Sequence, residues 1–412
     1  VNILAKDKEF YQLANWSVSP KENLLAYAED INGRRQYSIK FKDLDTDQTS
    51  NTTLENTSGD VAWSADGKYI FYVLRDEETL LPFQIFKHEV GKTQKEDVLI
   101  YQEKDTTFHL SVGNTRSMDF IEINISSNTS SEVRLINSSK PNEKPKVFLK
   151  REKDHLYSVD HDPADKRFLV ESNWMATNFR LLETNLEDSK DKNKWKELIP
   201  HRKEVLLQTV IPFPNHLVIM ERENGLRNLK ILEKNTNKIK TISFDDPSYT
   251  AYLASNPEYD VDRFYFGYSS MRKPDSLFSV KLSSGRKRLL KEAEIKGRFS
   301  SSEYKVERKF IEARDGVMVP VSIVYKKAKF KKNKNPLFVY GYGSYGISVD
   351  AGFSSSRLSL LDRGFVFAIA HVRGGQEMGR SWYEDGKMFN KLNTSHDFID
   401  VTQGLIDKGY GE

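Results

Sequence analysis

Short runs of β-branched and aromatic residues recur along roughly the first three hundred positions, and a polar turn precedes each run. The runs include Leu24–Tyr27, Tyr69–Val73, Arg167–Val170 and Arg263–Phe266. Runs of four or five such residues after a turn are typical of β-strands. The turns contain Asp-Gly or X-Pro pairs. In the first the glycine accommodates a positive φ, and in the second the proline fixes φ at a value suited to a turn. This half of the chain is therefore predicted to consist of short strands and tight turns.

The spacing of the turns indicates a repeat. The markers are Pro20, Ala65, Pro163, Pro214 and Pro257, which lie 45, 98, 51 and 43 residues apart. The long step leaves room for one unmarked unit near Ser111–Gly113. A unit of about 45–50 residues that recurs six times is the period of four-stranded propeller blades. Residues 1–300 are thus predicted to form a β-propeller, and a set of unrelated β-meanders is the alternative.

The pattern changes near residue 300. Two strands should flank the turn Arg314-Asp315-Gly316 as a hairpin. Continuous apolar strands and helices then alternate, in the order strand 336–340, helix 354–362, strand 365–370 and helix 395–408 with a stop at Gly409. Such alternation predicts a parallel sheet covered on both faces. Residues 301–412 are therefore expected to be the first part of an α/β domain, with strands and both chain ends missing.

Composition and charge exclude several classes of protein. The 412 residues carry a net charge of only +4, which argues against a generally basic nucleic-acid binder. The absence of Cys excludes disulfides and a Cys nucleophile. The longest apolar run, residues 365–370, is far too short for a membrane span. No signal peptide is visible after Val1, and the expected location is cytoplasmic.

A glycine-rich segment, Gly341-Tyr342-Gly343-Ser344-Tyr345-Gly346, follows the strand at 336–340. It matches the dinucleotide pattern G-x-G-x-x-G, but that fingerprint needs a helix directly after the third glycine, and a loop is expected here. Ser344 does not fit the nucleophile pattern G-x-S-x-G, because residue 342 is Tyr. The segment is therefore predicted to be a loop that binds no nucleotide and holds no nucleophile.

A second dense segment runs from His371 to Tyr383 and follows the strand at 365–370. In open α/β sheets, binding sites lie at the carboxyl ends of strands. We expect Arg373 and Glu377 to pair and fix this loop, either beside a site or as an ion pair with no catalytic part.

These segments together resemble the prolyl oligopeptidase family of serine peptidases. The resemblance rests on residues 337–346, Ser356-Arg357-Leu358, Asp362-Arg363-Gly364 and Arg373-Gly374-Gly375 through Trp382-Tyr383. Gly343-Ser344-Tyr345 is similar to the oligopeptidase B branch in particular. The resemblance implies a seven-bladed propeller, six blades of which lie in this chain, followed by an α/β-hydrolase domain.

The resemblance also implies roles for single residues. Tyr342 matches the tyrosine whose hydroxyl serves the oxyanion hole, and Tyr345 matches an aromatic residue of the specificity pocket. Asp350 matches an acid that favours basic substrate side chains. A second acid two positions on is replaced by Gly352, which weakens an acidic subsite.

In the order Ser…Asp…His of α/β-hydrolases, the nucleophile follows the helix that ends at Gly409. The triad is therefore expected outside this sequence, and this chain alone should be inactive. The implied function of the parent protein is a serine oligopeptidase that cuts short peptides after Arg or Lys. We expect no cofactor and no metal, no nucleic-acid or membrane partner, and a monomer or homodimer. A non-catalytic propeller that binds other proteins is the alternative.

Overall fold

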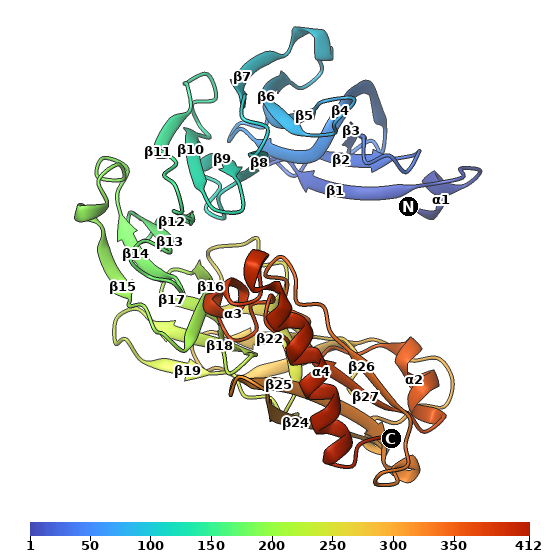
Figure 1. Ribbon diagram of the computed structural model, residues 1–412. Coiled ribbons are helices and arrows are strands. Elements are labelled where there is room, and N and C mark those ends of the chain that lie inside the picture. The colour runs from blue at the N-terminus through green and yellow to red at the C-terminus, as the bar shows by residue number, and fades with distance from the viewer. The chain divides into compact units, whose positions relative to one another are not determined.

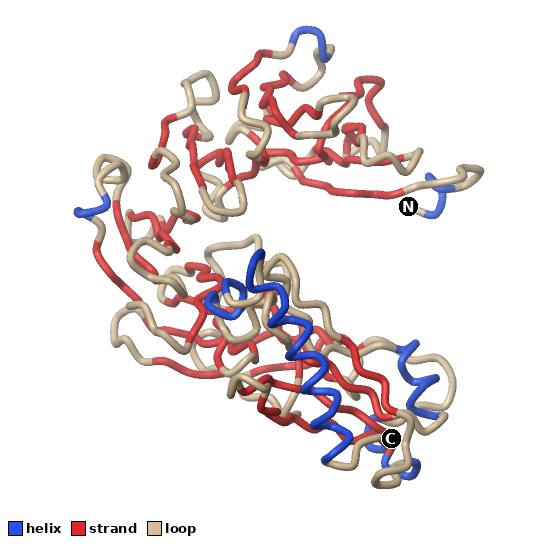
Figure 2. The backbone as a smooth tube through the Cα atoms, viewed as in Figure 1, coloured by secondary structure: helices blue, strands red, loops and turns tan.

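The computed structural model describes residues 1–412, which form two compact units. The first consists of Val1–Ser172 and Leu181–Leu198, and the second of Asn173–Arg180 and Ile199–Glu412. Strands dominate both units, and every α-helix longer than one turn belongs to the second (Figure 1, Figure 2). No helix combines the length and the apolarity that crossing a bilayer demands.

The first unit begins with the short helix α1 (Asn2–Ala5) and a seven-stranded antiparallel sheet, in which two blades share the long strand β4. Its strands are β1 (Gln12–Val18), β2 (Leu24–Asp30), β3 (Tyr37–Asp43), β4 (Thr49–Trp63), β5 (Tyr69–Arg75), β6 (Pro82–Glu89) and β7 (Val98–Gln102). The first half of β4 pairs with β3 and the second half with β5. The pairing register shifts between Thr57 and Val61, around Gly59 with its positive φ, which separates the two blades.

Two four-stranded blades complete the first unit. One is formed by β8 (His109–Asn114), β9 (Phe120–Ser126), β10 (Ser131–Asn137) and β11 (Lys146–Leu149). The other is formed by β12 (Tyr157–Asp162), β13 (Arg167–Ser172), β14 (Arg180–Thr184) and β15 (Lys196–Ile199). Arg180 at the start of β14 and Ile199 at the end of β15 are counted with the second unit.

The second unit contains two further blades of the same antiparallel meander. Their strands are β16 (Val205–Pro212), β17 (His216–Glu223), β18 (Leu226–Glu233) and β19 (Ile239–Thr241), then β20 (Tyr249–Leu253), β21 (Arg263–Ser270), β22 (Ser276–Lys281) and β23 (Lys287–Glu292). The chain therefore contains six blades, which confirms the predicted propeller architecture.

The predicted turn markers lie at one place in the blade, between its first and second strands. In the first three blades Ser19, Ser64 and Thr115 begin this turn, and each hydroxyl accepts a hydrogen bond from the N–H five residues later, at 3.0–3.2 Å. The turn at Thr115 belongs to the unit that had no Pro or Asp-Gly marker. The same side-chain hydrogen bond forms the turn in all three blades, so the turn at Thr115 can form without a Pro or Asp-Gly pair and carries no marker in the sequence.

The rest of the second unit is a four-stranded sheet with the order β24-β25-β27-β26. Its strands are β24 (Tyr304–Glu312), β25 (Met318–Lys326), β26 (Leu337–Tyr340) and β27 (Val366–Ala370). Only β26 and β27 are parallel, whereas β25 is antiparallel to both β24 and β27. The two apolar strands that alternate with helices are parallel, as predicted, and the predicted hairpin at Arg314–Gly316 joins β24 and β25. The sheet as a whole is mixed, because β25 also pairs antiparallel with β27, which the sequence did not predict.

Helices cover both faces of this sheet, as predicted. On one face, Val321 and Ile323 of β25 pack with Val401 and Leu405 of α4 (Lys391–Asp407). On the other face, Val324 and Phe367 pack with Leu361 of α2 (Ser355–Asp362). Figure 1 shows α4 lying along the sheet.

One helix begins earlier than predicted, and one short helix was not predicted. The Ser354 hydroxyl caps α2 by accepting the Arg357 N–H, at the predicted position. Helix α4 begins four residues before the expected Ser395, and a short helix α3 (Arg380–Glu384) precedes it.

Phe338 and Tyr340 of β26 are exposed, although the apolar run predicted a buried strand.

Candidate active site

The glycine-rich loop leaves the carboxyl end of β26 in a conformation that its residues explain. Gly343, Tyr345 and Gly346 all have a positive φ, of 64°, 56° and 67°. A Cβ on Gly343 would lie 2.4 Å from Thr394 Cγ2 and 2.8 Å from the Arg373 carbonyl oxygen, so only glycine fits. No helix follows until Ser355. The loop therefore lacks the helix that a dinucleotide fingerprint requires, as the sequence predicts.

The two tyrosines of this loop present their rings to solvent. The side chains of Tyr342 and Tyr345 are 42% and 79% exposed. The Tyr342 hydroxyl makes no hydrogen bond to another residue. A phenol that stands free at the carboxyl end of a strand can donate to a negatively charged oxygen of a bound molecule.

Contacts from two later segments hold the loop. The Gly346 N–H donates to the Gly374 carbonyl at 2.9 Å, and Gln376 Nε2 donates to the Gly346 carbonyl at 3.1 Å. Lys391 Nζ donates to the Gly343 carbonyl and, at 2.9 Å, to the Ser344 hydroxyl. The loop conformation thus depends on the segment after β27 and on the start of α4.

The expected pair of Arg373 with Glu377 is wrong. Arg373 instead makes a bidentate contact with Asp397 of α4, at 2.9 and 2.6 Å, and a further contact of 2.7 Å with Asp315. Asp397 first and then Asp315 raise the pKa of Arg373. A buried guanidinium fork is matched best by a carboxylate that accepts two parallel hydrogen bonds, and Asp397 provides that geometry.

Glu377 has a different partner. Its Oε1 accepts the Val349 N–H at 2.8 Å, and burial raises the pKa of Glu377 to about 7. It therefore ties the segment after β27 to the residue beside Asp350. Arg373 therefore connects its segment to Asp315 and Asp397, whereas Glu377 connects it to Val349.

Asp350 lies between two arginines of the fifth blade. Its Oδ1 contacts Arg222 of β17 at 2.8 Å, and its Oδ2 contacts Arg227 of β18 at 3.4 Å. Burial raises the pKa of the Asp350 carboxyl, but Arg222 and Arg227 outweigh that effect and hold it below its usual value. The carboxylate is therefore ionised, and its charge is compensated from within the protein.

A buried hydrogen-bonded chain lies beneath these loops. His371 Nε2 and the Ser322 hydroxyl are 2.7 Å apart, and Ser322 is 2.7 Å from the Ser248 hydroxyl of the propeller. Glu377 Oε1 lies 4.0 Å from His371 Nδ1. The order Ser–His–Glu is that of a catalytic triad, but Ser322 is 0% and His371 2% exposed, so no substrate reaches them. Burial, and then Arg308, lower the pKa of His371 to about 3, and the ring is neutral.

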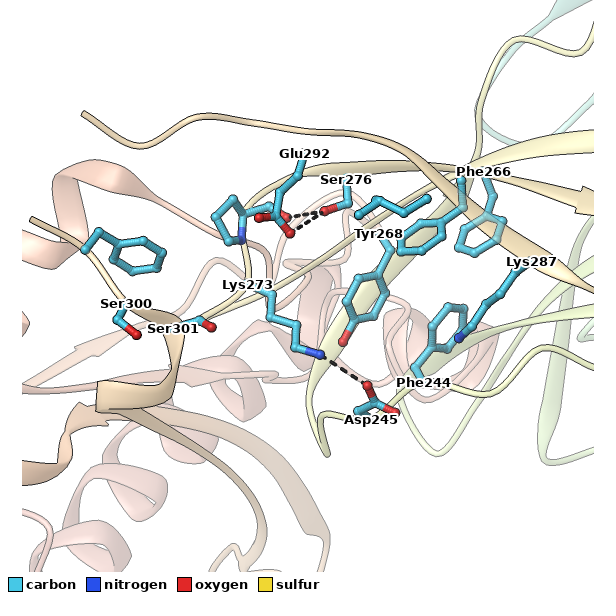
Figure 3. A pocket seen from close by; sticks show the side chains of 14 residues that line it. Phe244, Asp245, Phe266, Tyr268, Lys273, Ser276, Lys287, Glu292, Ser300 and Ser301 are labelled. Atoms are coloured by element: carbon cyan, nitrogen blue, oxygen red, sulfur yellow. Dashed lines mark hydrogen bonds and ion pairs between the residues drawn. The ribbon is translucent and has the colours of Figure 1, made fainter. Parts of the chain in front are cut away.

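A cavity of about 490 Å³ lies in the sixth blade, apart from these loops in the chain (Figure 3). Rings of Phe244, Phe266 and Tyr268 line it, and Lys273 pairs with Asp245 at 3.2 Å on its rim. None of the predicted site residues lines it. The Ser276 hydroxyl donates to Glu292 at 3.4 Å in this cavity, but no histidine lines it, and the glycine-rich loop remains the candidate active site.

Sequence reasoning missed the residues that hold these loops. Asp397 and Thr394 lie on the buried face of α4, and a buried acid on an amphipathic helix is a signal that a cation faces it. The arginines at 222 and 227 flank the hairpin turn Asn224-Gly225, but no pattern in the sequence connects them to Asp350.

Comparison with known proteins identifies the family. Residues 1–293 match the prolyl oligopeptidase N-terminal β-propeller domain, and residues 351–412 match the prolyl oligopeptidase family. The chain belongs to the prolyl oligopeptidase family, whose members are serine peptidases.

Two curated relatives align over the whole of this chain. Dipeptidyl aminopeptidase BI of Pseudoxanthomonas mexicana is 40% identical, and the chain covers 56% of it. Protease 2 of Moraxella lacunata is 36% identical, with 59% of it covered. The chain thus spans a little over half the length of these relatives.

Solved structures of oligopeptidase B have the same fold. That of Leishmania major aligns with a TM-score of 0.93 at 31% identity, and that of Trypanosoma brucei, with covalently bound antipain, with 0.92 at 32%. Each covers 100% of this chain, which covers 58% of each of them.

Proposed function

We propose that the full-length protein is a serine oligopeptidase that hydrolyses short peptides after Arg or Lys. The observation that carries the proposal is the Tyr342 hydroxyl, free of protein partners on a rigid glycine loop at the carboxyl end of β26. The similarity to Protease 2 and to oligopeptidase B supports the same activity.

The proposed chemistry is acyl transfer through a serine ester. Serine attacks the peptide carbonyl, histidine takes the serine proton and gives it to the leaving amine, and aspartate orients the histidine. We place all three residues outside these 412 positions. Tyr342 donates a hydrogen bond to the carbonyl oxygen as it becomes an alkoxide, and Tyr345 lines the pocket for the substrate side chain.

Hydrolysis of blocked fluorogenic peptides by the full-length protein tests this proposal. Peptides that end in Arg or Lys before the fluorophore should be cleaved at least tenfold faster than one that ends in Ala, and a serine-directed phosphonate should abolish cleavage. No cleavage of any of these peptides, or cleavage that the phosphonate leaves unchanged, would contradict it.

The relative named dipeptidyl aminopeptidase suggests a second mode of cleavage, the release of dipeptides from a free amino terminus. A pair of otherwise identical dipeptide substrates, one with a free and one with an acetylated amino terminus, separates the two modes. An oligopeptidase that cuts inside chains cleaves both, whereas a dipeptidyl aminopeptidase cleaves only the free one.

Asp350 is proposed to contact the substrate residue before the cleaved position. Because Arg222 and Arg227 compensate its charge, and Gly352 supplies none, we expect Lys over Ala at that position to be preferred by only about threefold or less. Asp350→Asn should remove that preference. If Asp350→Asn lowers kcat/KM equally for the Lys and the Ala peptide, Asp350 does not contact the substrate and only holds Arg222 and Arg227 in place.

We further propose that the propeller admits short peptides and excludes folded proteins. We also propose that the protein is located in the cytoplasm, needs no cofactor and is a monomer or a homodimer. Cleavage of a folded protein at the rate of a short peptide would contradict the exclusion.

A further inference from the structure

Lys391, the first residue of α4, holds the carbonyl that follows Tyr342. Its ammonium donates to the Gly343 carbonyl, to the Ser344 hydroxyl at 2.9 Å and to the Thr394 hydroxyl at 3.3 Å. Two of these three acceptors belong to the glycine-rich loop. The third belongs to the residue whose methyl group packs against Gly343.

This lysine differs from its neighbour in having no carboxylate partner. Lys387, four residues earlier, forms an ion pair with Glu384, as surface lysines often do. Lys391 makes no ion pair, and partial burial lowers its pKa. An ammonium directed at uncharged oxygens of one loop is placed to orient that loop rather than to neutralise a charge.

The loop needs such an anchor because of its own conformation. Gly343 has no side chain to restrict ψ, and Tyr345, which is not glycine, has a φ of 56°. Both features favour other conformations when the loop is not held. A change in the φ and ψ of Gly343 would turn its carbonyl away from Lys391 and change the direction in which the loop presents Tyr342.

We propose that Lys391 is a positioning residue that fixes Tyr342 for its role in the oxyanion hole. The inference rests on the proposed peptidase function. Lys391 touches neither the substrate nor the reacting atoms, and it acts through the Gly343 peptide.

The test uses three variants of the full-length protein and one blocked Arg peptide. Lys391→Met keeps the length of the chain and removes the ammonium, and it should lower kcat about tenfold with KM within twofold. Lys391→Arg keeps a donor cation and should stay within about threefold of wild type. Lys387→Met is the matched control on the same segment and should leave kcat unchanged.

A double-mutant cycle with Tyr342→Phe separates positioning from a general structural role. If Lys391 acts through the Tyr342 hydroxyl, adding Lys391→Met to Tyr342→Phe should change kcat by less than about twofold. A full tenfold loss in that background, or a kcat of Lys391→Met within twofold of wild type, would overturn the inference. Wild-type protein that cleaves no peptide would instead contradict the proposed function.

Discussion

At the scale of the residue, Tyr342 carries the strongest catalytic prediction. Its hydroxyl should bond to the substrate oxygen mainly in the transition state, so its removal should lower kcat and leave KM largely unchanged. Tyr342→Phe in the full-length protein keeps the ring and deletes only the O–H. Loss of one oxyanion donor costs about 10²–10³ in kcat. Steady-state kinetics with one good peptide measure the effect.

The opposing hypothesis is that the Tyr342 ring serves only for packing. It predicts almost no change in kcat for Tyr342→Phe. A kcat within about threefold of wild type, with chemistry shown to be rate-limiting, would remove Tyr342 from the oxyanion hole.

His371 predicts how stability depends on pH. In the unfolded chain its pKa is about 6.5, whereas burial lowers it to about 3 in the folded protein. Below pH 6.5 the unfolded state therefore binds a proton that the folded state does not, and stability that is present above pH 6.5 is lost as the pH falls toward 3. The slope is about 1.4 kcal/mol per pH unit for one proton.

His371→Gln removes this titration and keeps an amide that can reach Ser322. Urea unfolding at pH 7, 6 and 5 should show a smaller loss of stability for the variant, by about 1 kcal/mol between pH 6 and 5. Parallel pH profiles for the two proteins would mean that folding does not lower the pKa of His371.

The conformation of the glycine-rich segment could be predicted from its motif, whereas the partners of single residues that are distant in sequence could not. The glycine pattern at 341–346 fixes the place of Tyr342, because left-handed backbone and close packing require glycine there. The pairing of Arg373 could not be read from spacing, since Asp315 and Asp397 come from a hairpin and a helix on either side of it. Glu377 was predicted as the partner because it is near Arg373 in sequence, but in the folded chain Asp315 and Asp397 contact Arg373.

At the scale of the element, α4 depends on its buried ion pair. Asp397 is fully buried and accepts two hydrogen bonds from the side chain of Arg373. Asp397→Asn leaves the buried guanidinium with Asp315 alone, and the free energy of unfolding should fall by about 3 kcal/mol. Urea unfolding followed by tryptophan fluorescence measures the loss.

The same helix offers the matched control. Asp400 pairs with Arg314, which is half exposed, and water screens this contact. Asp400→Asn should therefore cost about 1 kcal/mol or less. If both variants lose the same free energy of unfolding, burial does not make the Arg373–Asp397 pair contribute more to stability than the exposed pair.

Elements were predicted where the apolar period and the end signals agree. Ser354 and Gly364 bracket α2 as expected, since one caps the first turn and the other accommodates a φ of 95° after the last. The start of α4 was missed because Lys391 to Thr394 carry no apolar stripe. Lys391 donates to the glycine-rich loop and Thr394 donates to the Arg373 carbonyl, and a hydrophobic period cannot show such polar contacts.

At the scale of the whole molecule, the repeat of turns was the most informative signal. Six blades follow from a period of about 45–50 residues, because each blade repeats one meander with its first turn in phase. The strand order of the sheet after residue 300 was less accessible. Apolar runs report burial but not direction, and only the hairpin at Arg314–Gly316 signalled an antiparallel pair.

The last prediction concerns this chain of 412 residues by itself. It contains Tyr342, the proposed oxyanion donor, but the Ser344 hydroxyl accepts a hydrogen bond from the Lys391 ammonium, and Ser322 and His371 are buried. Oxyanion stabilisation without a nucleophile and a base does not turn over a peptide at a useful rate. Incubation with a fluorogenic Arg peptide should therefore show only background hydrolysis. Turnover that survives repurification, and that a serine-directed phosphonate blocks, would mean that a nucleophile lies within these residues after all.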